Sequence, residues 1–127
     1  MKRRQFVTIA ATGAATIVAW LGYRAWSHPS FDPSLARPTA LATILDSAGI
    51  AALGVAYRRQ ARGEGSVRSL VRLLMAGAPT NGDALPASLA QRVQQDFHDG
   101  RVVHVDGWVL SLTEARQCAL HSLTARG

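Results

Sequence analysis

Cysteine is nearly missing from this sequence, since Cys118 is the single thiol among 127 residues. One thiol cannot close an intramolecular disulfide, so the fold has to be held together by packing alone. The same scarcity excludes haem attachment through Cys-x-x-Cys-His and an iron–sulfur cluster held by a set of cysteines. The sequence also lacks a glycine-rich phosphate-binding loop. We therefore expect no cofactor bound by this chain alone.

Lysine is equally scarce, because Lys2 is the only one and arginine supplies the remaining basic charge. The formal net charge of +6 is concentrated at the N-terminus, and from residue 29 onward ten arginines are set against eight acidic residues, a balance of +2. The one dense basic cluster is Arg58, Arg59 and Arg62, at the end of a predicted helix, where positive charge complements the helix dipole. Nucleic-acid-binding domains normally carry a basic stripe, so we predict no nucleic-acid partner.

The first residues resemble the twin-arginine export signature, which is two arginines, any residue, then phenylalanine and an apolar residue. Arg3, Arg4 and Phe6 occupy the defining positions, Lys2 replaces the usual serine or threonine, and a mildly hydrophobic stretch follows to about Leu21. The resemblance implies export in folded form by the twin-arginine translocase, with Arg3, Arg4 and Phe6 as the export signal. A general secretory signal or a plain membrane anchor with a basic start is the alternative.

Residues 1–27 are predicted to be either a cleaved signal or a retained membrane anchor. Ala25-Trp26-Ser27 is the nearest match to a cleavage site with small residues at two positions. Bulky aromatics surround it, however, and they are typical of a membrane interface. The stretch Phe6–Trp26 has 21 residues, enough to cross a bilayer as a helix. We expect the protein in the periplasm or, held to the membrane by this N-terminal helix, on the periplasmic face of the inner membrane.

The rest of the chain predicts a small, mainly α-helical domain over residues 39–127, after a proline-rich linker over 28–38. Gly54, inside the first expected helix, indicates a close contact with another helix. Apolar residues at helical spacing predict three helices. The first runs from near Thr39 or the Asp46-Ser47 cap to near Arg62, and Gly63 and Gly65 end it. The second runs from the Ser66 cap to Gly77. The third covers residues 86–98, with Leu89, Val93 and Phe97 as a core stripe.

A β-hairpin is predicted over residues 102–110. Asp106-Gly107 is a favoured two-residue turn because both of its positions need positive φ, and it joins strands over 102–105 and 108–110. Ser111 and Glu114 then form a capping box. This box begins a last helix that runs to about Leu123, with Leu112, Ala115, Ala119 and Leu123 on one face. The expected fold class is therefore mainly α: an N-terminal signal or anchor helix, then three to four helices and one hairpin.

Cys118 and His121 lie three residues apart on the last helix and are the best candidates for chemistry. Together with His98 or His104 they would make a metal site, although structural zinc usually shows two clusters of paired ligands. His121 is also the only local base that would activate Cys118 as a nucleophile. The simpler interpretation is that Cys118 is a small buried hydrophobe and that His121 is exposed or caps a helix.

The acidic side chains near the hairpin are predicted to have structural roles. Asp96 and Asp99 flank a helix end, while Asp106 fits the turn and Glu114 fits the cap. Trp108, directly after the turn, is favoured as a core residue. The other interpretation makes it an interface anchor, since aromatic residues dominate binding hot spots. On that interpretation Trp108 and Val109 are the partner-binding residues.

The C-terminal part of the chain resembles the recurrent ending of small proteins with twin-arginine signals. The resemblance is carried by Asp96-Phe97, Gly100-Arg101, Val105 to Ser111 and Thr113 to Leu120, and extends loosely to Leu53-Gly54 and Tyr57-Arg58. In layout, such proteins are similar to the small exported subunits of membrane-associated flavin dehydrogenases, as in gluconate 2-dehydrogenase subunit 3. The resemblance implies a leader, a small helical body and a larger protein subunit as partner, with no cofactor motif in this chain.

These observations predict an exported, non-catalytic accessory subunit that escorts or anchors a partner oxidoreductase in the cell envelope. The twin-arginine route carries proteins that fold before crossing, so a chain without a cofactor site fits export together with a cofactor-bearing partner. The alternative is a small envelope redox or metal-binding protein that uses Cys118 and His121. A third interpretation is an anchored structural protein without a partner.

Overall fold

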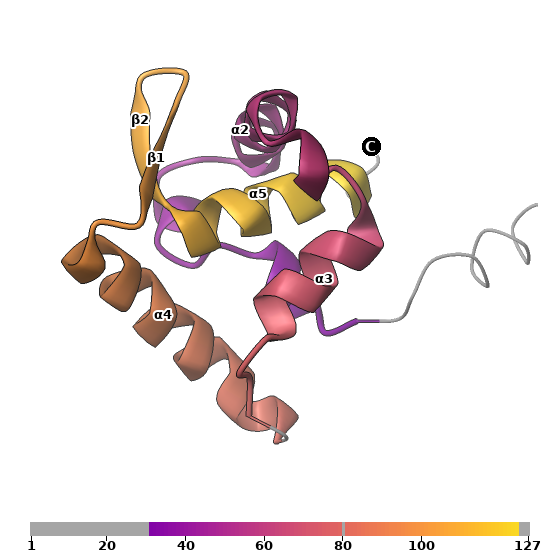
Figure 1. Cartoon of the computed structure of the whole chain (residues 1–127), viewed down its shortest axis with the longest axis vertical. Helices are drawn as coiled ribbons and strands as arrows, with labels where there is room; N and C mark the ends of the chain where they lie inside the picture. The colour runs from indigo at the N-terminus through magenta and orange to yellow at the C-terminus, as the bar shows by residue number, and fades with distance from the viewer. Residues whose placement is uncertain (1–30, 80, 125–127) are drawn as a thin grey trace, which may run out of the picture. The chain divides into compact units, whose positions relative to one another are not determined.

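The C-terminal helix α5 (Leu112–Thr124) lies at the centre of the folded unit, with the other helices arranged around it (Figure 1). The computed structural model describes residues 31–79 and 81–124. The predicted signal or anchor helix falls on residues that lie outside this range. Ala115, Cys118, Ala119 and Leu120 of α5 are completely buried. A helix buried on nearly all sides occupies the core of a fold instead of covering it.

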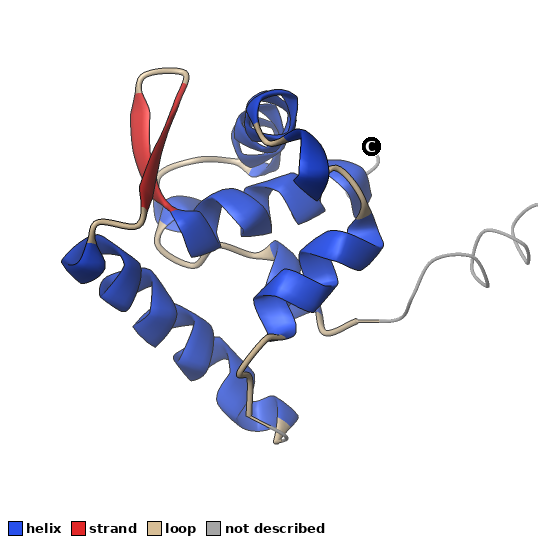
Figure 2. Cartoon of the chain, in the orientation of Figure 1, coloured by secondary structure: helices blue, strands red, loops and turns tan. Residues whose placement is uncertain are grey.

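The described residues form four α-helices and one antiparallel hairpin near the C-terminus, as the sequence predicts (Figure 2). Short 3₁₀ turns η1 to η4 connect them. The elements before α5 are η1 (Pro33–Ala36), η2 (Leu41–Thr43), α2 (Ser47–Gln60), η3 (Arg62–Glu64), α3 (Val67–Met75), η4 (Gly82–Ala84), α4 (Leu85–Asp99), β1 (Val102–Val105) and β2 (Trp108–Ser111). None of these described helices has the length and apolar character needed to cross a bilayer.

The proline-rich segment is part of the core, so the prediction of a linker up to residue 38 is wrong for its described part. Pro33 begins η1, where its fixed φ suits a first helical turn. Asp32 caps that turn by accepting a hydrogen bond from the Ser34 backbone N–H at 2.9 Å. Leu35 is completely buried among the core residues. Gln117 of α5 holds the segment further by donating to the Ser34 carbonyl at 3.0 Å.

Helix boundaries follow the capping residues closely. Asp46 caps α2 by accepting from the Gly49 N–H at 2.8 Å, so the helix begins at the later of the two predicted starts. Ser66 caps α3 in the same way through the Ser69 N–H at 3.1 Å. Gly100 ends α4 in the left-handed conformation with φ 76°. The predicted end of α2 is wrong by a short margin, because the helix stops at Gln60 and residues 62–64 form the separate turn η3.

Helix α4 packs on the core through different residues from those predicted. Leu89 is buried and Val93 half-buried, but Phe97 is exposed, so the expected stripe does not continue to the end of the helix. The buried side chain of the last turns is Asp96, which accepts hydrogen bonds from the Thr113 backbone N–H at 2.8 Å and from Arg101 Nε at 3.0 Å. Asp96 therefore caps α5 from a neighbouring helix, because an unpaired N–H at a buried helix start needs an acceptor.

Helix α2 crosses closely over α5 at Gly54. A methyl group at Gly54 would lie 2.0 Å from the carbonyl oxygen of Cys118, well inside van der Waals contact. The predicted close helix contact is thereby confirmed. Further along, Glu64 joins the same two helices, because its carboxylate accepts from the Tyr57 hydroxyl at 2.9 Å and from Arg116 Nε at 2.8 Å.

We expect Gly54→Ala to destabilise the protein strongly, because the added methyl meets backbone and not a flexible side chain. The expected loss in free energy of unfolding is about 3 kcal/mol, the upper range for overpacking. Urea unfolding followed by circular dichroism measures it. Gly63→Ala is the matched control, since a methyl group there meets nothing within 4 Å. Equal stability of the two variants would contradict the close crossing.

Candidate functional site

The hairpin carries Trp108 and Val109, the two side chains predicted to bind a partner. Its turn has the predicted geometry, with φ 48° at Asp106 and 84° at Gly107. Val105 pairs with Trp108, and the neighbouring pair is His104 with Val109. Paired residues share a face, and successive residues point to opposite faces. Trp108 and Val109 therefore point to opposite faces of the hairpin.

Trp108 lies on the face of the hairpin that meets the core. Val105 and Leu110, which share this face, are buried, but the Trp108 side chain remains 37 % exposed. The structure thus places Trp108 among the exposed large apolar residues and not in the core, where the favoured assignment put it. Val109 is 51 % exposed, on the outer face that it shares with His104. Partner binding through these residues stays a prediction.

Phe97 is a third exposed apolar residue at this end of the folded unit. It lies in the last turn of α4, where the chain leads through Gly100 into the hairpin (Figure 1). Its side chain is 44 % exposed. The sequence reasoning missed Phe97 as a surface residue because its spacing of four from Val93 matches a core stripe. Helix α4 and strand β2 are in contact, and Phe97 lies at the end of α4 that leads into the base of the hairpin.

Cys118 does not have the environment of a reactive thiol. It is completely buried, and its backbone carbonyl group lies against Gly54 of α2. Burial first, and then the nearby Glu114 carboxylate, raise the pKa of the Cys118 thiol to about 12. Nucleophilic and metal-binding cysteines need a depressed pKa and access to solvent. The simpler interpretation, a small buried hydrophobe, fits this geometry.

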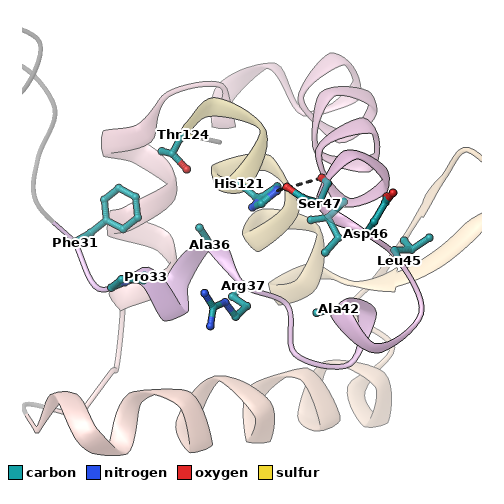
Figure 3. A pocket seen from close by; sticks show the side chains of 11 residues that line it. Phe31, Pro33, Ala36, Arg37, Ala42, Leu45, Asp46, Ser47, His121 and Thr124 are labelled. Atoms are coloured by element: carbon teal, nitrogen blue, oxygen red, sulfur yellow. Dashed lines mark hydrogen bonds between the residues drawn. The ribbon is translucent and has the colours of Figure 1, made fainter. Parts of the chain in front are cut away.

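His121 contacts the start of α2 in a wide cavity of about 710 Å³ (Figure 3). Its Nε2 atom lies 2.9 Å from Ser47 Oγ and 3.2 Å from the Ser47 carbonyl oxygen. A carbonyl oxygen only accepts hydrogen bonds, so it is the tautomer with the proton on Nε2 that donates to both oxygens. In this tautomer Ser47 is not activated as a nucleophile. His121 thus joins α5 to the first turn of α2, whose cap is Asp46, and the capping role considered for His121 is not what the structure shows.

The remaining candidate ligands do not come together in the described part of the chain. Within residues 31–79 and 81–124, no group of three or more His, Cys, Asp or Glu side chains is arranged to hold a metal ion. Asp99 pairs with Arg101 at 3.1 Å. Ser111 and Glu114 form the predicted capping box, with reciprocal bonds of 3.1 and 3.0 Å.

A second cavity, which the sequence reasoning missed, lies between the 39–43 turn, α4 and α5. Its volume is about 280 Å³, and both Glu114 and Gln117 of α5 line it. The two residues are three apart on one helix, a spacing that places them on the same face. That spacing was the one sign of the cavity in the sequence. The capping box already explained Glu114, however, and no neighbouring residue indicates that Gln117 is buried.

Arg3, Arg4 and Phe6, the predicted export signal, lie outside the described residues, and the leader stays a prediction. No protein-family model, curated protein or solved structure matches this chain. The candidate sites therefore rest on the sequence and on the geometry of the folded unit.

We expect Cys118 to be inert toward thiol reagents in the folded protein. Raising its pKa from 9.0 to about 12 makes the thiolate about a thousandfold rarer at neutral pH, and burial blocks access as well. The reaction with an aromatic disulfide reagent, followed by absorbance with and without urea, measures this. The thiol should react only after unfolding. Rapid labelling of the native protein would contradict this and would support the alternative of a redox protein that uses Cys118 and His121.

Proposed function

We propose that this chain is an exported, non-catalytic accessory subunit that docks on a larger oxidoreductase subunit in the cell envelope. The observation that carries the proposal is the hairpin, which stands at one end of the folded unit with apolar side chains exposed (Figure 1). Val109 faces outward and Trp108 is partly exposed near the turn, while the exposed Phe97 lies in the last turn of α4, before the base of the hairpin.

The hairpin is well suited to form the core of an interface. Aromatic anchors surrounded by apolar contacts dominate binding energy in protein complexes, and the backbone of Trp108 is paired with that of the buried Val105. A two-stranded hairpin has marginal stability in water, yet this one is fixed at its base, because the Ser111 N–H bonds to Glu114 and the Leu112 N–H to the Arg101 carbonyl. A partner would therefore meet a largely preformed surface, which lowers the entropic cost of binding.

The twin-arginine signature supports the location and the escort role. Arg3, Arg4 and Phe6 are the residues proposed to engage the translocase, which exports folded proteins. A cofactor-bearing partner without a signal of its own would cross together with this chain. The complex would then lie in the periplasm or on the periplasmic face of the inner membrane, with residues 1–27 as the membrane attachment if they are retained.

Co-purification of the tagged chain from its native host in mild detergent, with mass spectrometry, tests this proposal. We expect one larger, cofactor-bearing subunit in constant ratio. Val109→Lys should reduce its recovery at least about tenfold, equivalent to 1.4 kcal/mol of binding energy. Ile44→Lys is the matched control, since Ile44 is 65 % exposed and lies outside the hairpin.

Two results would contradict the proposal. One is a solitary chain that is exported normally and brings down no other subunit. The other is an equal loss of the partner in Val109→Lys and Ile44→Lys, which would show that the hairpin has no special part in the contact.

A further inference from the structure

The cavity of about 280 Å³ is lined by both apolar and polar side chains. Leu89 and Val93 of α4, together with Ala40, provide apolar surface, while Glu114 and Gln117 of α5 provide oxygen and nitrogen atoms. The volume is close to the lower limit of small-molecule sites. The cavity shares no lining residue with the hairpin. An inference drawn from it is therefore independent of the proposed docking surface.

Glu114 uses only one of its carboxylate oxygens within the fold. Oε1 accepts a hydrogen bond from the Ser111 backbone N–H at 3.1 Å, and Oε2 bonds to no described residue. The side chain is only 4 % exposed. Among the described residues, however, no fully buried side-chain oxygen or nitrogen lacks a partner. Oε2 therefore keeps some solvent-accessible surface, and Glu114 is one of the residues that line the cavity.

Gln117 presents a second acceptor to the same cavity. Its Nε2 donates to the carbonyl oxygens of Ser34 at 3.0 Å and Arg37 at 3.3 Å. These two acceptors fix the orientation of the amide, because a carbonyl can bond only to the nitrogen end. Oε1 bonds to no residue in the described ranges, although Gln117 is only 2 % exposed. By the same argument as for Glu114, this oxygen keeps some solvent-accessible surface, and Gln117 also lines the cavity.

The carboxylate of Glu114 has no ion-pair partner among the described residues. No arginine or histidine within the described ranges forms an ion pair with Glu114. Burial raises the pKa of the Glu114 carboxyl, the bond from Ser111 opposes that rise, and the Asp96 carboxylate adds to it. Both burial and Asp96 thus disfavour the negative charge, and a cation in the cavity would relieve both effects.

We propose that this cavity binds a primary ammonium group on a short aliphatic chain, such as a free alkylamine or a lysine side chain. An ammonium group is a compact charge with three donors, which suits Glu114 Oε2 and Gln117 Oε1 together. A guanidinium group binds best to both oxygens of one carboxylate, whereas here the free acceptors belong to two side chains and Oε1 of Glu114 already accepts the Ser111 N–H. The aliphatic chain would contact Leu89 and Val93.

Calorimetric titration of the full chain with n-butylammonium tests the proposal, and Glu114→Gln is the decisive variant. Glutamine also serves in a capping box, so this variant keeps the helix start and removes only the charge. Its affinity should fall at least tenfold. Asp106→Asn is the matched control, because it removes one negative charge from the exposed turn, where asparagine also tolerates positive φ, and it should bind like the original protein.

A second variant and two further ligands make the outcome unambiguous. Ala90→Leu narrows the cavity from an exposed position, keeps both oxygens and should also weaken binding. N-acetyl-lysinamide tests the lysine source: binding of this compound alone identifies a lysine side chain, and binding of butylammonium alone identifies a free amine. Absence of binding by both amines, equal affinity in Glu114→Gln, or equal binding of neutral n-butanol would overturn the proposal.

Discussion

The structure depends on the contact between the backbones of α2 and α5 at Gly54. Because Gly54 has no side chain, α2 can approach until the Cys118 carbonyl lies where a Cβ atom would otherwise be. Such an approach requires small residues on α5 as well, and Ala115 and Ala119 are completely buried there. Helix α5 thus becomes the centre of the fold, and the proline-rich segment, α3, α4 and the hairpin pack around it.

A central helix of this kind has to bury polar groups, and their partners come from distant parts of the chain. The α5 N-terminus takes its acceptors from Asp96 on α4 and from its own Glu114, while Gln117 holds the 34–37 segment. Each of these contacts stabilises the fold. Those of Glu114 and Gln117 also leave one oxygen on each side chain without a described partner, which is the origin of the proposed ammonium site. Glu114 and Gln117 therefore both stabilise the fold and form the proposed binding site.

Local signals in the sequence were sufficient for most of the fold. The Asp46 and Ser66 caps, the Asp106-Gly107 turn and the Ser111–Glu114 box involve neighbours in the chain, so the sequence alone predicts them correctly. The errors concern contacts between distant segments. Spacing alone cannot show that α4 buries a carboxylate instead of Phe97. It also cannot show that a proline-rich stretch packs on a helix about 80 residues later, where Gln117 binds the Ser34 carbonyl across 83 positions.

Amide hydrogen exchange of the full chain, read residue by residue, tests most directly whether the α2–α5 crossing is the centre of stability. The slowest-exchanging amides report the part of a protein that opens only on global unfolding. We predict that they lie in α2 around Gly54 and in α5 around Cys118, with faster exchange in α4 and the hairpin. If the slowest amides lie in α4, or if α2 opens before the rest of the fold, the crossing is not what the structure depends on.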